Sequence, residues 1–311
     1  MSVLITGGNG HVSSWIAYLL AKAGRKVICF DASPIVPPIL ESVKDNIEFV
    51  RGDVLDFALL TNLVNRNRDS LEGIIHTAAL MHTHLTANPH RNLSINWNSL
   101  LNVLELARIF EIPKVVYTST GGVYGGAEGV VTEAGNPACP EDIYSVTKYS
   151  GEMLGAQYEN EFGVDFRVAR IFFVYGPDRL PSGFFPFYQA CFGPLEGLKG
   201  IRFEKGGDQK LDFTYVEDAA RGVMMLLDAD NLGHKVFNIA TGTGVSLFDV
   251  LALSRKYASV ESDIVMGPGE FAKRPEALDI SLAKAELGYE AQYSIEDGVK
   301  AYAEWYNQHH G

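Results

Sequence analysis

Apolar positions in the first half of the chain alternate between short runs and longer segments with helical spacing. Residues 2–6 form an apolar, partly β-branched run that ends at two glycines, which predicts a buried strand. In residues 12–24 the apolar side chains recur every three or four positions, which predicts an amphipathic helix that Gly24 ends. The same patterns predict further strands at 26–30, 47–50, 73–79, 114–120 and 164–170, and helices at 94–110 and 141–163.

This alternation of strands and helices is typical of a parallel sheet covered by helices on both faces. We therefore predict an α/β fold over residues 1–170, a Rossmann-type doubly wound parallel sheet. Beyond residue 170 the alternation loosens into a stretch rich in glycine, proline and aromatic residues, which predicts a smaller C-terminal substrate lobe over residues 171–311. Segments within 212–242 are expected to return to the first domain. The later half also predicts a strand at 235–240 and helices at 246–257 and 294–308.

The composition limits the kinds of molecule that the protein is expected to bind. The chain has 311 residues, 47% of them hydrophobic, and a formal net charge of -12, and such an acidic surface repels nucleic acid and anionic lipid. No apolar run approaches the roughly 20 residues that span a bilayer, and a strand that begins at residue 2 leaves no room for a signal peptide. The three cysteines are an odd, scattered set, so we expect neither disulfides nor a zinc site. We expect a cytoplasmic protein that binds a small molecule and no metal, nucleic acid or membrane.

A glycine-rich loop, TGGNGHVSS, separates the first predicted strand from the first predicted helix. Gly7, Gly10 and Ser13 hold the three key positions of a G-x-x-G-x-x-G pattern, with Ser in the third. Glycines there let the backbone approach a pyrophosphate, which the helix N-terminus also attracts. Asp31 ends the second strand about 20 residues later, where a carboxylate binds the adenosine ribose diol and repels a 2′-phosphate. The pattern therefore indicates a dinucleotide site that favours NAD over NADP.

Two further acidic or hydroxyl-bearing segments lie at predicted strand ends. Asp53 follows the third strand, where its side chain would meet the adenine amino group or cap the next helix. Residues 118–120, Thr-Ser-Thr, end the fifth strand at the carboxyl edge of the sheet, where ligands bind in such folds.

Tyr144 and Lys148 stand four residues apart on a predicted helix, so their side chains share one face. This spacing also occurs on ordinary exposed helix surfaces. A phenol has an ordinary pKa near 10 and is a poor base, but a neighbouring ammonium favours the phenolate. Such a phenol can take the proton of a substrate hydroxyl while hydride leaves the same carbon for a nicotinamide. The order of glycine loop, Asp31, hydroxyl cluster and Tyr–Lys pair favours this acid–base role.

In this combination the chain resembles the extended short-chain dehydrogenase/reductases, in particular the NAD-dependent epimerase/dehydratase family. The resemblance spans nearly the whole chain and rests on these stretches: TGGNGHVSS, Asp31, GDVLD, HTAAL, NWNSLLNVLELA, TSTGGVYGG, YSVTK, RIFFVYGPDR and LDFTYVEDAARG.

The resemblance implies a role for each matching residue. Tyr144 would be the catalytic base, Lys148 its pKa modulator and a ribose ligand, and Thr120, with Ser119 as the alternative, would bind the reacting oxygen. Residues 1–170 would form the NAD-binding domain. The residues expected at the NAD cofactor are Gly7, Asn9, Gly10, His11, Val12, Asp31, Asp53, Val54, Ala78, Ala79, Leu80, Asn96, Tyr144, Lys148 and Val174.

The substrate end departs from the family pattern. Phe173 and Leu211 stand where members that bind nucleotide sugars carry Asn and Arg, and Arg274 matches one remaining diphosphate contact. Neither Phe nor Leu can donate to a phosphate. We therefore expect a NAD-dependent enzyme that transfers hydride at a secondary alcohol carbon of a sugar-like substrate. The alternatives are a UDP- or dTDP-sugar 4-epimerase or dehydratase, a dehydrogenase of a bulky apolar alcohol, and a non-catalytic dinucleotide sensor.

Aromatic and histidine residues near these segments allow two interpretations each. The cluster Phe173, Phe184, Phe185, Phe187 and Tyr188 fits either the core of the second lobe or an apolar substrate wall, and we favour the core. His82 follows the fourth strand, and with His84 it fits a substrate contact better than a metal site. The resemblance further implies a homodimer in which the helices at 94–110 and 141–163 pair with a second subunit.

Overall fold

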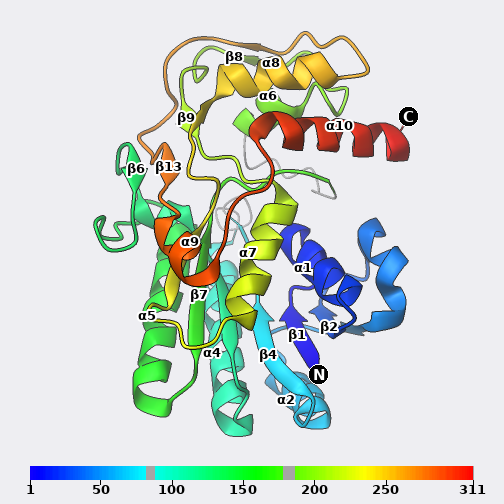
Figure 1. Ribbon diagram of the computed structural model, residues 1–311, viewed down its shortest axis with the longest axis vertical. Helices are drawn as coiled ribbons and strands as arrows, with labels where there is room; N and C mark the ends of the chain where they lie inside the picture. The colour runs from blue at the N-terminus through cyan, green and yellow to red at the C-terminus, as the bar shows by residue number, and fades with distance from the viewer. Residues whose placement is uncertain (82–87, 178–185, 311) are drawn as a thin grey trace.

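A seven-stranded parallel sheet forms the centre of the molecule (Figure 1). The computed structural model describes residues 1–81, 88–177 and 186–310. The strand order is β10-β7-β5-β4-β1-β2-β3, and every pair is parallel. This confirms the predicted Rossmann-type α/β fold. In chain order the strands are β1 (Ser2–Thr6), β2 (Lys26–Asp31), β3 (Ile47–Arg51), β4 (Leu71–His76), β5 (Val115–Thr120), β7 (Phe166–Ile171) and β10 (Val236–Ile239).

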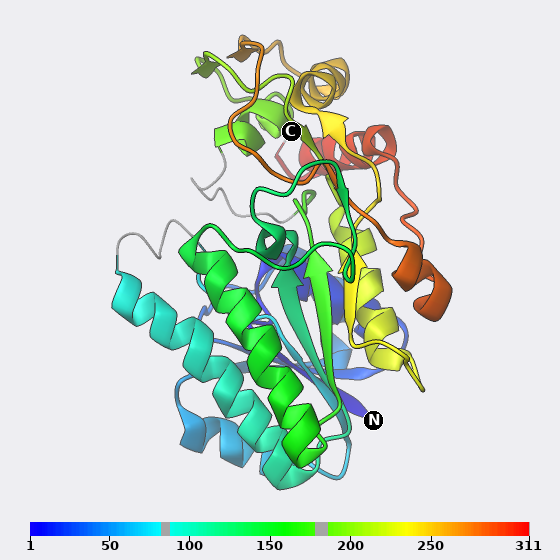
Figure 2. The ribbon, with the colours of Figure 1, turned by 90° about the vertical axis from the view of Figure 1, so that its left-hand side faces the viewer.

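Helices cover both faces of the sheet, each over its own apolar core. One face carries α1 (His11–Lys22), the 3-10 helix η1 (Pro38–Asn46) and α7 (Val216–Asp228). The other face carries α2 (Phe57–Asn67), α4 (Pro89–Phe110) and α5 (Ile143–Phe162). Figure 2 shows α4 and α5 side by side in front of the sheet. Both faces are buried, which is why the strands are continuous apolar runs.

Helix α4 begins five residues before the predicted start at residue 94. The Asn88 side chain accepts a hydrogen bond from the Arg91 amide, and Pro89 occupies the first helical turn. Asn at the cap and Pro just inside the helix are both favoured at a helix start. The prediction used the apolar spacing alone, and that spacing begins only one turn later.

A second lobe lies above the carboxyl ends of the strands (Figure 1). Its own apolar core contains residues of α6 (Pro186–Phe192), α8 (Leu247–Tyr257) and α10 (Ile295–His310). Four short strands accompany them, with β8 (Arg202–Phe203) paired to β12 (Val265–Met266) and β9 (Lys210–Leu211) paired to β11 (Val245–Ser246). The remaining elements are η2 (Gly121–Tyr124), β6 (Val130–Val131), β13 (Ala277–Leu278) and α9 (Ser281–Leu287).

The chain crosses between the lobes more than once. After the first part of the second lobe, α7 packs on α1 and β10 adds to the sheet beside β7. Both elements lie within residues 212–242, the stretch for which a return was expected. The exact domain limits at residue 170 stay a prediction.

Two glycines let α5 lie close to the sheet. A Cβ atom at Gly151 would stand 2.7 Å from the Tyr117 hydroxyl, and one at Gly155 would stand 2.1 Å from the Phe166 ring. Real Cβ atoms essentially never approach other atoms this closely. The helix therefore reaches β5 and β7 at short range, and its inward-facing side chains lie directly on the sheet.

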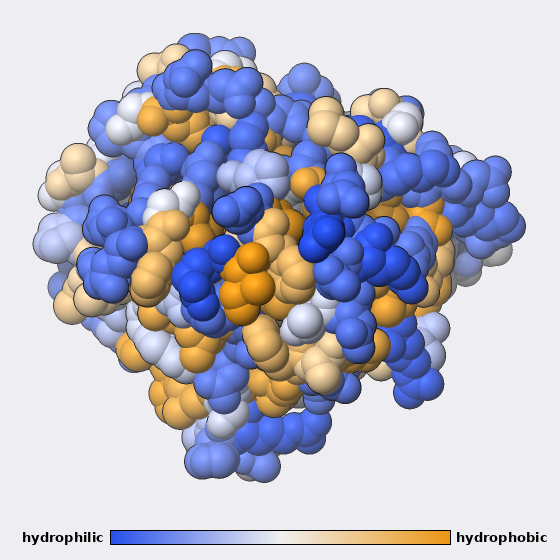
Figure 3. Space-filling model, turned by 90° about the horizontal axis from the view of Figure 1, so that it is seen from below, coloured by the Kyte–Doolittle hydropathy of each residue, from blue (hydrophilic) through white to orange (hydrophobic). Residues whose placement is uncertain are grey.

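The outer surface mixes hydrophobic and hydrophilic residues. Seen from the amino-terminal edge of the sheet, hydrophobic surface appears in separate patches among hydrophilic residues (Figure 3). Among the residues that the structure describes, no helix is both long and apolar enough to cross a membrane.

Candidate functional site

A cavity of about 570 Å³ opens at the carboxyl ends of the strands, beneath the second lobe. Its wall combines residues from the glycine loop, the ends of β2, β3, β4, β5 and β7, helices α4 and α5, and the second lobe. Almost all of the described residues that the sequence assigns to a cofactor, catalytic or substrate site line this cavity. These are Gly7, Asn9, Gly10, His11, Val12, Asp31, Asp53, Val54, Ala78, Ala79, Leu80, Ser119, Thr120, Tyr144, Lys148, Phe173, Val174 and Arg274.

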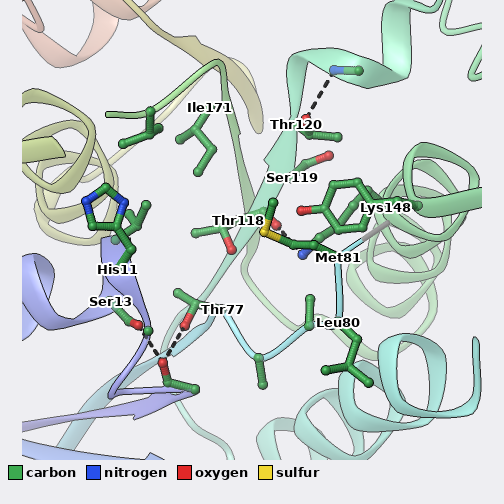
Figure 4. A pocket seen from close by; sticks show the side chains of 18 of the residues that line it. His11, Ser13, Thr77, Leu80, Met81, Thr118, Ser119, Thr120, Lys148 and Ile171 are labelled. Atoms are coloured by element: carbon green, nitrogen blue, oxygen red, sulfur yellow. Dashed lines mark hydrogen bonds between the residues drawn. The ribbon is translucent and has the colours of Figure 1, made fainter. Parts of the chain in front are cut away.

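The glycine loop forms a tight turn at one end of the cavity. Gly7 has φ 73°, a conformation that side chains disfavour, and a Cβ there would stand 2.8 Å from the backbone of Ala78. Its carbonyl accepts hydrogen bonds from the Gly10 amide, at 3.0 Å, and from the Ser13 hydroxyl. Ser13, the departure from the glycine pattern, thus fastens the turn from the first helix (Figure 4).

Asp31 connects the end of β2 to the glycine loop. Its two carboxylate oxygens accept from the Asn9 amide at 3.0 Å and the Ser33 amide at 2.8 Å. Asn9 in turn donates its side-chain amide to the Ser33 carbonyl, at 3.0 Å. The Asn9 side-chain oxygen is buried without a hydrogen-bond partner among the described residues. A buried acceptor of this kind is costly unless a ligand supplies a donor.

Asp53 and Val54 form the neighbouring stretch of wall. The Asp53 carboxylate accepts from the Leu55 amide at 2.9 Å and so shapes a turn. The alternative that Asp53 caps the following helix is wrong, because Asp56 caps α2 by accepting from the Leu59 amide.

The segment Ala78–Leu80 runs along the middle of the cavity and is held from behind by Asn96. Asn96 is 4% exposed, and it exchanges hydrogen bonds with Leu80, accepting from the amide at 2.7 Å and donating to the carbonyl at 3.1 Å. It also donates to the Thr147 hydroxyl at 3.2 Å. The structure therefore places Asn96 behind the cavity wall and not on it.

Tyr144 and Lys148 project from α5 toward the ends of β4 and β5. The Lys148 Nζ atom donates to the main-chain oxygen of Thr118 at 2.7 Å and lies 5.8 Å from the centre of the Tyr144 ring. Figure 4 shows Lys148 beside Thr118 and the hydroxyls of Ser119 and Thr120. The start of α5 is fixed by Asp142, which accepts from the Ser145 amide at 2.8 Å and the Ser145 hydroxyl at 2.9 Å.

Burial controls the charge of both members of this pair. Burial, with a smaller effect from Asp142, raises the pKa of Tyr144 above its ordinary value. Burial also lowers the pKa of Lys148 to about 7, although Glu152 opposes that change. The expected lowering of the phenol pKa by the ammonium is thus outweighed, because a low-dielectric site disfavours both charged forms. Tyr144 is a neutral phenol in this state of the site.

The hydroxyls of Ser119 and Thr120 differ in whether their protons are available to a ligand. Ser119 is 1% exposed and donates its proton to the Glu152 carboxylate. The Thr120 oxygen accepts from the Gly122 amide at 3.1 Å, and its proton has no acceptor among the described residues, so it is available to a ligand. Of the two, Thr120 is the better donor to a ligand in the cavity.

One part of the cavity wall is aromatic. Phe173 stands at φ 34°, an uncommon conformation for a bulky residue. Its ring packs on Phe172 at 4.4 Å and Phe213 at 5.9 Å between centroids. Phe173 and Tyr188 both line the cavity and pack against the core of the second lobe, so the two interpretations of the aromatic cluster overlap. Phe184 and Phe185 lie outside the described residues.

Arg274 joins this aromatic end, and its side chain has no ion pair or hydrogen bond among the described residues. Leu211, by contrast, is 1% exposed in the core of the second lobe and does not reach the cavity. Lys210 faces Glu276, 3.6 Å away. His82 and His84 lie outside the described residues. Within the described part of the chain no three potential ligands gather as for a metal ion.

Sequence reasoning missed several residues of the wall. Asp142 carried a local signal, since Asp three residues before Ser145 at a helix start is typical of a cap. Arg91 sits in the first turn of α4, whose start was placed too late. Phe213 comes from the second lobe, far along the chain, and no local pattern links it to the glycine loop.

The cavity thus combines a turn suited to a pyrophosphate, a carboxylate suited to a ribose, and a phenol, an amine and a free hydroxyl at its centre. This set can bind a dinucleotide and move a proton at a hydroxyl-bearing carbon.

Comparison with known proteins agrees with this arrangement. The profile of the family described as "NAD dependent epimerase/dehydratase family" matches residues 3–240. The UDP-glucuronate 4-epimerase of Thermodesulfobacterium geofontis is 28% identical, over 97% of this chain and 95% of that protein. The crystal structure of UDP-glucose 4-epimerase from Thermotoga maritima, with UDP-glucose, is 27% identical with a TM-score of 0.87 and covers 99% of both chains. That of UDP-glucuronic acid 4-epimerase from Bacillus cereus in complex with NAD is 27% identical with a TM-score of 0.83, over 100% and 98% of the two chains.

The low pKa of Lys148 predicts a pH-dependent difference in stability. Between pH 7 and pH 9 the unfolded chain keeps the lysine proton, whereas the folded chain releases it near pH 7. Raising the pH therefore favours the folded state. We expect the unfolding free energy of the natural protein to rise, relative to Lys148→Met, by about 2 kcal/mol over this range.

Urea unfolding at pH 7, 8 and 9 measures this difference. Lys205→Met removes an exposed lysine instead and should show no such trend. A constant difference between the natural protein and Lys148→Met across the range would contradict the assigned pKa.

Proposed function

Because the chain belongs to the NAD-dependent epimerase/dehydratase family, we propose that it transfers hydride reversibly between a secondary alcohol carbon of a sugar-like substrate and NAD. One observation carries the proposal. Tyr144, Lys148 and the free hydroxyl of Thr120 line the same cavity as the glycine turn and Asp31.

The residues present fit the dinucleotide. The Asn9 side-chain oxygen is a buried acceptor that a ribose hydroxyl of the dinucleotide would satisfy, and Gly7 lets the loop turn against the Ala78 backbone, where a Cβ would collide. NAD would accept the hydride when bound. We propose that the following residues hold it: Gly7, Asn9, Gly10, His11 and Val12 along the pyrophosphate, Asp31 at the adenosine ribose, Asp53 and Val54 at the adenine, and Ala78, Ala79, Leu80, Lys148 and Val174 toward the nicotinamide.

The protein's part in the reaction is to bind the alcohol and move its proton. Thr120 donates its free proton to the substrate oxygen and holds it in place. Tyr144 first releases its own proton to solvent, and the phenolate then accepts the hydroxyl proton as the carbon gives up hydride and the C–O single bond becomes a carbonyl. A protonated Lys148 offsets the charge of the phenolate during this step. The reverse step returns the proton from Tyr144.

A second candidate is 4-epimerisation of a nucleotide-linked sugar. The three similar proteins described above are all named as 4-epimerases of UDP-sugars, and one was solved with UDP-glucose. Arg274 supports this candidate, because it offers a half-buried guanidinium to an anionic group. The aromatic residues Phe173, Phe213 and Tyr188 support an apolar or stacked group at the same end.

We propose that the protein is a homodimer whose subunits meet through α4 and α5. The two helices pack side by side (Figure 2), and their outer surfaces expose large apolar residues. Trp97 on α4 is 39% exposed, and Val146 and Met153 on α5 are 47% and 57% exposed. Such residues on adjacent helices favour burial against a partner.

We also propose a cytoplasmic location. The composition is acidic, and the three cysteines are free, with Cys29 and Cys191 buried and apart from each other in different cores. Free thiols are typical of a reducing compartment.

The base assignment predicts the effect of Tyr144→Phe. Loss of the phenol hydroxyl should lower turnover by about 100-fold or more, while NAD affinity stays nearly unchanged. Absorbance of NADH reports turnover with a panel of free sugars, sugar acids and UDP-sugars, and product analysis shows whether a net epimer or an oxidised product forms. Tyr149→Phe, on the same helix but away from the cavity wall, is the matched control. Undiminished turnover in Tyr144→Phe rules out its role.

The ribose assignment predicts a change in cofactor preference. Asp31→Ala should weaken NAD binding about tenfold or more, because a charge-assisted hydrogen bond is lost. Rejection of NADP should relax as the repelling charge disappears. Fluorescence titration with both dinucleotides measures this, with Asp69→Ala at an exposed position as the control. Unchanged affinities for both dinucleotides would show that Asp31 does not face the ribose.

The dimer proposal predicts that charge on the helix surface separates the subunits. The double variant Trp97→Glu with Val146→Glu should sediment as a monomer at micromolar concentration, because burying two carboxylates is costly. Val260→Glu changes an exposed apolar residue of similar exposure, 48%, outside these helices and should leave the dimer intact. A natural protein that sediments as a monomer removes the proposal.

A further inference from the structure

A buried carboxylate lies one helical turn beyond Lys148. Tyr144, Lys148 and Glu152 follow one another at four-residue intervals on α5, so they share the helix face that packs on the sheet. Glu152 is 5% exposed and stands behind the cavity wall.

The Glu152 carboxylate is held entirely by side chains of the two strands beneath it. Arg170 on β7 donates from Nη2 at 2.6 Å and from Nε at 3.1 and 3.2 Å. Ser119 on β5 donates its hydroxyl to the other side. Arg170 further donates to the Tyr124 hydroxyl at 2.9 Å. These contacts fix the carboxylate in one place relative to Lys148.

A buried ion pair contributes little to stability compared with apolar residues of the same shape. Its position directly behind the Tyr–Lys pair therefore suggests an electrostatic role. We propose that Glu152 is a positioning residue that places a fixed negative charge behind Lys148 and so raises the fraction of that side chain that is an ammonium near neutral pH. The inference rests on the proposed function only in giving Lys148 a task that needs its charge.

The groups that face Lys148 from each neighbouring element support this role. From β4, His76 is neutral, because burial and the Lys148 charge lower its pKa to about 3. From β5, the Tyr117 ring lies 4.6 Å from Nζ, and burial raises its pKa. On η2, Tyr124 contacts Arg170, and burial raises its pKa as well.

On α4, Asn96 and Ser99 face this region as uncharged groups, and Glu105 is occupied with Arg108 and Tyr158 farther along the helix. On α5, Asp142 acts on Tyr144. Glu152 alone acts against the burial that lowers the pKa of Lys148.

The test uses two variants that break the same ion pair from opposite sides. Glu152→Gln removes the negative charge and leaves Arg170 positive, so the pKa of Lys148 should fall by about one unit or more. Arg170→Gln removes the positive charge and keeps Glu152, so the pKa should stay or rise. Tyr124→Phe removes a bond to Arg170 without changing any charge and should leave the pKa in place.

The 13Cε resonance of Lys148 in the lysine-labelled free protein reports this pKa directly, and its loss in Lys148→Met identifies the signal. If Glu152→Gln does not fold, Glu152→Asp is used in its place. That variant keeps the negative charge but moves it farther from Lys148, so a smaller fall in the pKa of Lys148 is expected. The limb of the pH–turnover profile that reports the ionisation of Lys148 should shift along the pH axis together with the pKa measured from the resonance.

Opposite or unequal responses of the two charge variants support the proposal. If both folded variants leave the pKa unchanged, or lower it equally, the ion pair has only a structural role and the proposal is overturned. The resonance is measured without substrate or cofactor. A failure to oxidise any alcohol would therefore count against the proposed function while this test still gives its own answer.

Discussion

The hydrogen bond from Lys148 to the main-chain oxygen of Thr118 ties the helix that carries the Tyr–Lys pair to the central strand of the site. It forms only because Gly151 and Gly155 let α5 lie against β5 and β7. With the helix at this distance, the phenol, the amine and the Thr120 hydroxyl reach one cavity. A bulkier residue at either glycine would move all three groups away from the glycine turn together.

Close packing also explains the charge state of the site. The same contact that positions Lys148 removes it from water, so the neutral amine becomes competitive near neutral pH. The phenol responds in the other direction and holds its proton more tightly. Burial therefore disfavours the charged form of both members, and Glu152, held by its ion pair with Arg170, opposes that effect at Lys148.

Most of the sheet and most of the cofactor end of the site could be predicted from the sequence. Apolar runs and helical spacing locate the strands, because both faces of the sheet are buried, and the glycine loop and Asp31 are local in sequence. The Phe213, Tyr188 and Arg274 side chains meet Phe173 only through the folding of the second lobe, so their joint position is a tertiary property. The pKa of Tyr144 was misjudged for the same reason: spacing reveals the neighbouring ammonium, but only packing reveals the loss of solvent. The early start of α4 depended on Asn88, a cap that apolar periodicity does not register.

The return of α7 and β10 to the first lobe bears on how the chain folds. A polypeptide that ended at residue 170 would make β7 the edge strand in place of β10 and would uncover the apolar side of α1 that α7 protects. Open edges and bare apolar surface of this kind promote association between chains. During synthesis, the first lobe therefore receives its last strand, β10, only after more than sixty further residues have been made.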